Sequence, residues 1–107
     1  MRINLKQTKN PRVKLTPQMS MYDSLGNRWR PFIMYFHTPN VRSSTVNTDE
    51  LGFRITHFNG RDYSIGTDEL YSNDVSFIVG GSTAFGVGAT SDRMTLSSLL
   101  SQKSGRL

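Results

Sequence analysis

The chain has 107 residues, enough for one small domain or for part of a larger one. It contains no cysteine, which excludes disulfides and thiolate metal sites, and no apolar run in it is long enough to cross a bilayer. The amino-terminus is charged but lacks the apolar core segment of a secretory signal. We therefore expect a soluble protein without a membrane span, located in a reducing cytoplasm.

The net charge of +5 is concentrated near the amino-terminus. Residues 1–30 carry seven basic side chains and one acidic side chain, whereas residues 31–107 carry six basic and seven acidic side chains. A basic arm of this kind can contact nucleic acid, anionic lipid or an acidic partner protein. Because it lacks the interleaved aromatic residues of a stacking surface, we favour a solvated extension and consider nucleic acid an unlikely partner.

Two short alternating pieces lie in this arm, at residues 2–6 and 12–15, and prolines stand at Pro11 and Pro17. Alternation over so few residues indicates either a short edge strand or a disordered segment. The stretch 19–30 has no clear period, and residues 24–27 favour a turn.

The most aromatic stretch of the chain is 29–36. It predicts a strand or extended segment, although Pro31 argues against a central position in a sheet. We expect its aromatic side chains to pack against a neighbouring layer. Residues 38–40 end the segment.

A hairpin is predicted further along. Residues 49–50 favour a turn, residues 53–58 predict a strand, and the Asn-Gly pair at 59–60 is a strong turn signal. A weaker extended piece at 63–65 would supply the second strand of the hairpin.

Residues 75–79 predict a buried strand, because their near-continuous apolar character is typical of parallel strands covered on both faces. A glycine-rich loop follows at 80–88. Residues 91–92 offer an N-cap for a predicted helix at 93–103, which 104–105 would end. The apolar face of this helix would consist of Met94, Leu96, Leu99 and Leu100.

The glycine-rich loop partly matches two nucleotide-binding patterns. Gly81 and Gly86 have the spacing of a phosphate-binding loop, but Val87 and Gly88 stand where a lysine and a hydroxyl residue are needed. The dinucleotide pattern beginning at Gly86 has Ser91 in place of its third glycine. Since both patterns are incomplete, we expect no cofactor.

Ser82 is the candidate catalytic residue. A turn after a buried strand would lift its hydroxyl above the sheet, and Gly80 and Gly81 would leave room for a substrate. The N–H groups of Ser82 and its followers would help to bind an oxyanion. The structural alternative, a plain strand-to-helix turn that contains a serine, has equal weight from the local sequence.

Residues 77–88, Phe-Ile-Val-Gly-Gly-Ser-Thr-Ala-Phe-Gly-Val-Gly, resemble the first conserved segment of the SGNH hydrolases, also called the GDSL esterase/lipase family. Residues 46–54, Val-Asn-Thr-Asp-Glu-Leu-Gly-Phe-Arg, look like a segment that often precedes the catalytic domain in such proteins. The matching parts are 46–54 and 75–103, and residues 1–45 show no resemblance.

The resemblance implies that Ser82 is the nucleophile and that Gly81, Ser82 and Thr83 form the oxyanion loop, with the Ser82 N–H as a donor. The family's commoner aspartate at this point is Gly81 here. Its other oxyanion donors and its catalytic aspartate and histidine come from later segments, which the 25 residues after Ser82 do not contain.

His37 and His57 are the two histidines that could replace the missing base. Both precede Ser82, opposite to the family order, although chain order alone does not forbid a triad. The commoner role of such histidines is structural. The acidic residues lie on predicted turns and connectors without metal-ligand spacing, so we expect no metal site.

We therefore expect a basic arm at 1–30, a β-rich lead-in at 31–74 and the start of an SGNH-like α/β domain at 75–107, with the first strand, loop and helix of a parallel-sheet sandwich. The chain would be the amino-terminal fragment of a serine ester hydrolase, inactive alone and completed by a missing carboxyl-terminal region or a partner chain. Its substrates would be esters such as acylated carbohydrate or lipid. The alternative is a non-catalytic binding or assembly module whose basic arm contacts a polyanion or partner protein.

Overall fold

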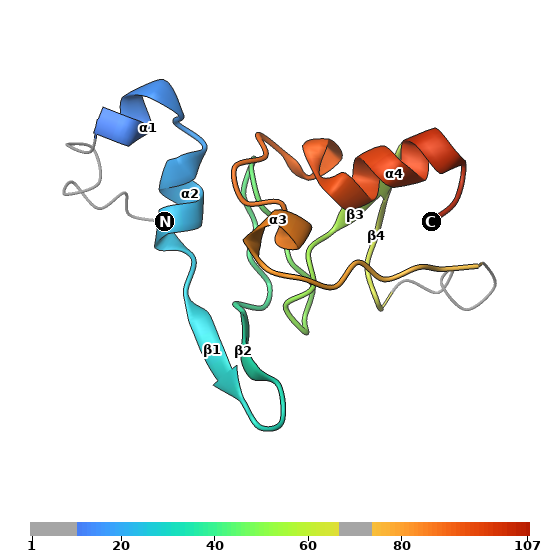
Figure 1. Cartoon of the computed structure of the whole chain (residues 1–107), viewed down its shortest axis with the longest axis horizontal. Coiled ribbons are helices and arrows are strands. Elements are labelled where there is room, and N and C mark those ends of the chain that lie inside the picture. The colour runs from blue at the N-terminus through green and yellow to red at the C-terminus, as the bar shows by residue number, and fades with distance from the viewer. Residues whose placement is uncertain (1–10, 67–73) are drawn as a thin grey trace.

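A computed structural model of the chain describes residues 11–66 and 74–107, apart from the side chains of Arg30, Met34 and Tyr35. These residues form a small α/β domain in which four α-helices accompany two antiparallel two-stranded sheets (Figure 1). The first ten residues of the predicted basic arm and most of the connector before residue 74 lie outside the described residues. None of the described helices is long and apolar enough to span a bilayer.

Two short helices open the described part of the chain, α1 (Pro11–Leu15) and α2 (Met19–Ser24). The prediction of an edge strand or disorder at 12–15 is therefore wrong. Pro11 stands at the first position of α1, where its fixed φ suits a helix and its missing N–H removes no helical hydrogen bond. Arg12 of α1 forms an ion pair with Asp23 of α2 at 2.9 Å, which joins the two helices.

The predicted aromatic strand is instead a hairpin of β1 (Asn27–Arg30) and β2 (Met34–His37), which pair antiparallel. The chain reverses at 31–33, where Pro31 cannot donate to a ladder and Phe32 has a φ of +66°. The single extended segment predicted for 29–36 is wrong because this turn divides it.

The aromatic side chains of this hairpin divide between solvent and the rest of the domain. Trp29 and Phe32 are exposed, which contradicts the expected packing against a layer. Phe36 meets that expectation, since its ring packs edge-to-face on Phe53 with centroids 5.0 Å apart. The β2 end of the hairpin therefore packs on the domain through Phe36.

The second hairpin, β3 (Thr56–Phe58) with β4 (Arg61–Tyr63), confirms the prediction from the Asn-Gly pair. Asn59 and Gly60 both have positive φ, 48° and 75°, as a tight two-residue turn requires. β3 is shorter than the strand predicted at 53–58, and β4 begins at Arg61 rather than at residue 63. This register places His57 opposite Asp62.

Residues 75–80 form neither helix nor strand, so the predicted buried strand is wrong. They run as a nearly straight segment beneath α4 in the view of Figure 1. Ser76 donates a backbone hydrogen bond to the Leu107 carbonyl at 3.2 Å, while Phe77 and Val79 are 62% and 91% exposed. A parallel strand needs neighbours at its edges and layers on both faces, and the described residues supply neither.

The last part of the chain contains α3 (Ser82–Phe85), a 3-10 turn (Asp92–Met94) and α4 (Leu96–Ser104). The predicted N-cap at 91–92 is wrong because the 3-10 turn comes first, and the side chain of Thr95 caps α4. Gly105, with a φ of +70°, ends α4 as predicted.

Helix α4 turns its polar side inward. Ser98 and Ser101 are buried, and the Ser98 hydroxyl donates to the Asp92 carbonyl and accepts from the His57 backbone N–H. The apolar face predicted for this helix is exposed, because the layer that it would cover is not among the described residues. The exposed side chains on this face are Met94, Leu96, Leu99 and Leu100.

The interior of the described domain is mainly polar. Among its hydrophobic side chains, only Tyr22 and Val46 are buried, whereas buried polar or charged residues are more numerous. Since polar groups must be hydrogen-bonded to be buried without a large penalty, this fold depends on its internal hydrogen-bond network. The buried polar and charged residues are Thr45, Thr48, Asp49, Asp92, Thr95, Ser98 and Ser101.

Candidate functional site

Ser82 is the first residue of α3 and is exposed. Gly81, with an extended backbone, precedes it as the N-cap, and the straight segment 75–80 leads into the bend. The first N–H groups of an α-helix have no intrahelical acceptor, which includes those of Ser82 and Thr83. The loop predicted at 80–88 therefore contains a helix of four residues, and the buried strand predicted before Ser82 is not formed, while the role of Ser82 as a nucleophile stays a prediction.

The two glycines before Ser82 have different surroundings. A Cβ at Gly80 would lie 3.0 Å from the Cβ of Ala84, which is closer than a real side chain tolerates without movement. A Cβ at Gly81 would have no heavy atom within 4 Å. Gly80 therefore allows the segment to approach α3 closely, whereas the space beside Gly81 is open.

The main chain of Ser82 is fixed through its carbonyl oxygen. This oxygen accepts hydrogen bonds from the N–H groups of Gly86 at 3.0 Å and Val87 at 2.9 Å. Gly86 has a φ of +86°, and a Cβ there would lie 3.0 Å from the Thr95 side chain, so both its conformation and its space require glycine. The position of Ser82 consequently depends on the turn at 85–87.

Arg54 binds this turn through its guanidinium group. Its side chain is only 6% exposed, and its Nη1 donates to the carbonyl oxygens of Phe85 at 3.1 Å and Gly86 at 2.9 Å. Nη1 also donates to the Tyr22 hydroxyl at 2.8 Å, and Nη2 donates to the Thr45 carbonyl at 2.8 Å. One guanidinium thus connects the Ser82 loop with helix α2 and the loop before β3.

Asp92 supplies the opposite charge. Its Oδ1 accepts from Arg54 Nε at 2.9 Å, and its side chain is 11% exposed. Asn47 donates to the same carboxylate from its backbone N–H at 3.2 Å and from Nδ2 at 2.6 Å. The two segments that carry the family resemblance, 46–54 and 75–103, therefore meet at this ion pair.

Tyr22 joins the amino-terminal helices to the same site. It is buried, and its hydroxyl oxygen lies 2.9 Å from the Gly86 carbonyl oxygen and 2.8 Å from that of Ala89. Gln18 Nε2 also donates to the Gly88 carbonyl at 3.2 Å. Helix α2, which the sequence did not predict, thus packs on the glycine-rich loop.

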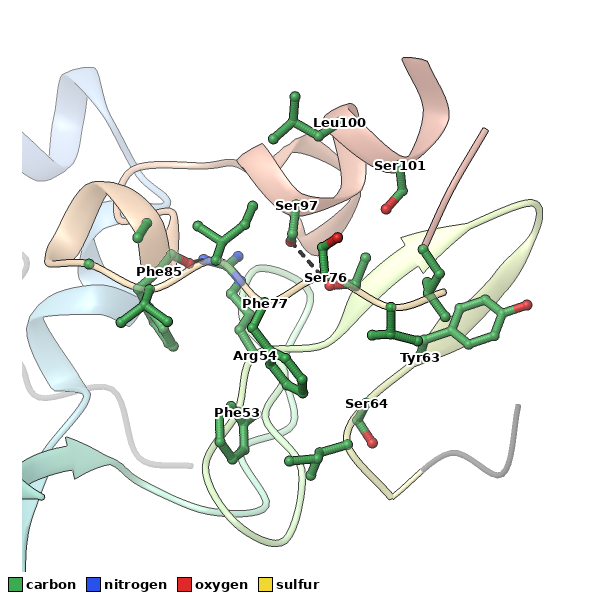
Figure 2. A pocket seen from close by; sticks show the side chains of 18 of the residues that line it. Phe53, Arg54, Tyr63, Ser64, Ser76, Phe77, Phe85, Ser97, Leu100 and Ser101 are labelled. Carbon is green, nitrogen blue, oxygen red and sulfur yellow. Dashed lines mark hydrogen bonds between the residues drawn. The ribbon is translucent and has the colours of Figure 1, made fainter. Parts of the chain in front are cut away.

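An open groove of about 530 Å³ lies beside this loop (Figure 2). Ser97, Leu100 and Ser101 of α4 and Phe85 of α3 are among its lining residues, which Figure 2 labels. Ser82 does not line the groove, although its neighbours Gly80 and Ala84 do. Apolar side chains among its lining residues include Phe53, Ile65, Phe77, Val79, Phe85 and Leu100.

Neither histidine is placed as a base for Ser82 in the described part of the chain. The ring of His37 stacks on Phe85, with centroids 3.6 Å apart, and no hydrogen bond joins it to Ser82. His57 Nδ1 lies 2.8 Å from Asp62 Oδ1 across the β3–β4 hairpin. Both histidines therefore have structural contacts, which agrees with the commoner role expected for them.

The His37 ring makes stability dependent on pH. Burial lowers the pKa of His37 from its ordinary 6.5, and the nearby Arg54 guanidinium lowers this pKa further. Below about pH 6.5 the unfolded chain binds a proton at His37 that the folded chain does not. The free energy of unfolding should therefore decrease as the pH is lowered, until His37 of the folded chain is also protonated. Thermal melts between about pH 8 and pH 5 measure this slope.

His37→Phe is the matched control, because it keeps a ring against Phe85 and cannot titrate. The stability of this variant should fall less than that of the wild type over the same acidic range. Equal slopes for the two proteins would contradict the assignment.

The comparisons with known proteins add no relative. No protein-family model matches the sequence, and no curated protein matches it significantly. Within residues 11–66 and 74–107, no group of three or more His, Cys, Asp or Glu side chains could hold a metal ion. The functional interpretation therefore depends on the residues and geometry of the Ser82 loop.

The Arg54–Asp92 pair is the part of the site that the sequence did not reveal. Its partners are 38 residues apart, so no local pattern connects them. The available signal was the resemblance itself, since the two matching segments contain one partner each.

Proposed function

We propose that this chain carries the nucleophile loop of a serine ester hydrolase of the SGNH type. Ser82 acts as the nucleophile, and its N–H, in the loop with Gly81 and Thr83, is an oxyanion donor. The observation that carries the proposal is the exposure of Ser82 at the first position of a helix, after a glycine bend that follows an apolar segment. The rigid hydrogen-bonded turn behind it also supports this role, because a nucleophile has to be held in place.

In this reaction the Ser82 oxygen attacks the ester carbonyl while a base takes its proton. The carbonyl oxygen becomes an oxyanion that backbone N–H groups stabilise. Collapse of the intermediate releases the alcohol and leaves an acyl group on Ser82, which water then removes as a carboxylic acid. Acylated carbohydrate or lipid is the substrate class that the resemblance favours.

The base and its acidic partner are proposed to come from outside the described residues, in a further segment or a partner chain. The exposed apolar side chains of the straight segment and of α4 support this, since they form a surface suited to further packing. The parallel sheet of the predicted fold would be completed there.

Because this apolar surface is open, the 107-residue chain alone should self-associate. Sedimentation over a range of concentrations should show species larger than a monomer, and replacing Phe77 and Val79 with threonine should weaken the association. Leu15→Ser is the control, because Leu15 is 86% exposed on α1 and should not contribute. A stable monomer at every concentration would contradict the proposed surface.

The functional test compares the 107-residue chain with the complete product of the natural reading frame. Because none of the described residues places a base at Ser82, the 107-residue chain should cleave p-nitrophenyl acetate no faster than its Ser82→Ala variant. The complete product should cleave the ester, and Ser82→Ala should abolish this activity whereas Ser76→Ala should retain most of it. Full activity in the Ser82→Ala product would refute the proposed nucleophile.

A further inference from the structure

Arg54 is the one buried guanidinium described in contact with the Ser82 loop, and it binds the loop through main-chain atoms. The carbonyls of Phe85 and Gly86 lie at the end of α3, where a helix leaves carbonyl groups without intrahelical donors. A cation at this end is also favoured by the helix dipole. Arg54 thus supplies donors to the free carbonyl groups at the end of α3. This helix has only four residues and cannot be stable by itself.

The contacts of this turn continue directly to Ser82. Arg54 holds the carbonyls of residues 85 and 86, and the N–H groups of Gly86 and Val87 hold the Ser82 carbonyl. Movement of the turn would therefore move the main chain of Ser82. We propose that Arg54 is a positioning residue, which fixes the main chain of the Ser82 loop by binding the Phe85 and Gly86 carbonyls.

The geometry requires arginine rather than another cation. Nη1 donates to the turn and to the Tyr22 hydroxyl, Nη2 donates to the Thr45 carbonyl, and Nε donates to Asp92. The donors therefore point in three directions within one plane. A lysine has a single ammonium group and cannot reproduce this fork. Asp92, itself held by Asn47, fixes the orientation of the guanidinium plane.

The test measures backbone order in the 107-residue chain by NMR relaxation. In the wild type, residues 82–87 should have order parameters of about 0.85. In Arg54→Met the order parameters of these residues should fall toward about 0.6, while those of α4 change less. Arg54→Lys should give values between these two. Gly60→Ala is the control, because it destabilises the distant β3–β4 turn and should leave residues 82–87 ordered.

Unchanged order at 82–87 in Arg54→Met would overturn the positioning role. If this variant does not fold, Arg54→Lys decides, and wild-type order at 82–87 in that variant overturns the proposal. These readouts do not require Ser82 to be catalytic, so they remain decisive if the proposed function fails.

The catalytic consequence depends on the proposed function and is measured in the complete product. Arg54→Lys should lower kcat by on the order of tenfold and leave KM nearly unchanged, because Arg54 binds the Phe85 and Gly86 carbonyls and acts on Ser82 through this turn. A rise in KM with an unchanged kcat would contradict a positioning role, since it would indicate lost substrate binding.

Discussion

Replacing Asp92 with asparagine should lower the free energy of unfolding by about 3–5 kcal/mol, which is the usual effect of removing one partner from a buried ion pair. Arg54 would be left buried without a counter-charge. The new amide group would also face donors, because Arg54 Nε and both Asn47 nitrogens point at this carboxylate. Equilibrium unfolding in urea measures the change.

A double-mutant cycle separates the pair from the loss of general packing. Arg54→Met with Asp92→Leu removes both charges and should be less destabilising than the sum of the single changes. Asp23→Asn is the control, because it breaks the exposed pair with Arg12 and should change stability by less than about 1 kcal/mol. An effect of Asp92→Asn as small as this control would show that the buried pair does not stabilise the fold.

Gly52→Ala should be similarly disruptive, with a loss of about 2–5 kcal/mol from backbone strain and overpacking together. Gly52 has a φ of +98°, and a Cβ there would lie 2.5 Å from the His37 carbonyl oxygen. That oxygen belongs to the main chain, so a side-chain rotation cannot relieve the clash. The β2 strand would have to move away from the loop that contains Asp49.

Gly60→Ala separates strain from clash in this experiment. Gly60 also has a positive φ, 75°, but a Cβ there would meet nothing within 4 Å. Its alanine variant should lose only about 1–2 kcal/mol, the conformational part. Equal losses at the two positions would contradict the proposed contact between Gly52 and β2.

The elements that the sequence predicted correctly are those with a local cause. The hairpin at 56–63 follows from the Asn-Gly pair, whose backbone preference does not depend on distant residues. Gly105 ends α4 for the same kind of reason, since a glycine readily takes the left-handed conformation.

The incorrect predictions concern burial and pairing, which are not local. The apolar residues of 75–79 and α4 have the composition of a buried strand and an amphipathic helix, but the described residues do not provide the layer that would cover them. Alternation at 12–15 indicated an edge strand or disorder, while Pro11 at the first helical position and the contacts of the following helix favour helical turns. The buried pair of Arg54 and Asp92 forms only when distant segments meet.

The most direct measurement is the mapping of a fluorophosphonate adduct in the complete product of the natural reading frame. Trypsin releases residues 62–93 as one peptide, and its fragment ions distinguish Ser82 from Ser76 and Ser91. We predict one phosphonate on Ser82, lost after heat denaturation before labelling, because only the folded loop activates this hydroxyl. An adduct on another serine, or no adduct in a product that hydrolyses esters, would contradict the assignment of Ser82 as the nucleophile.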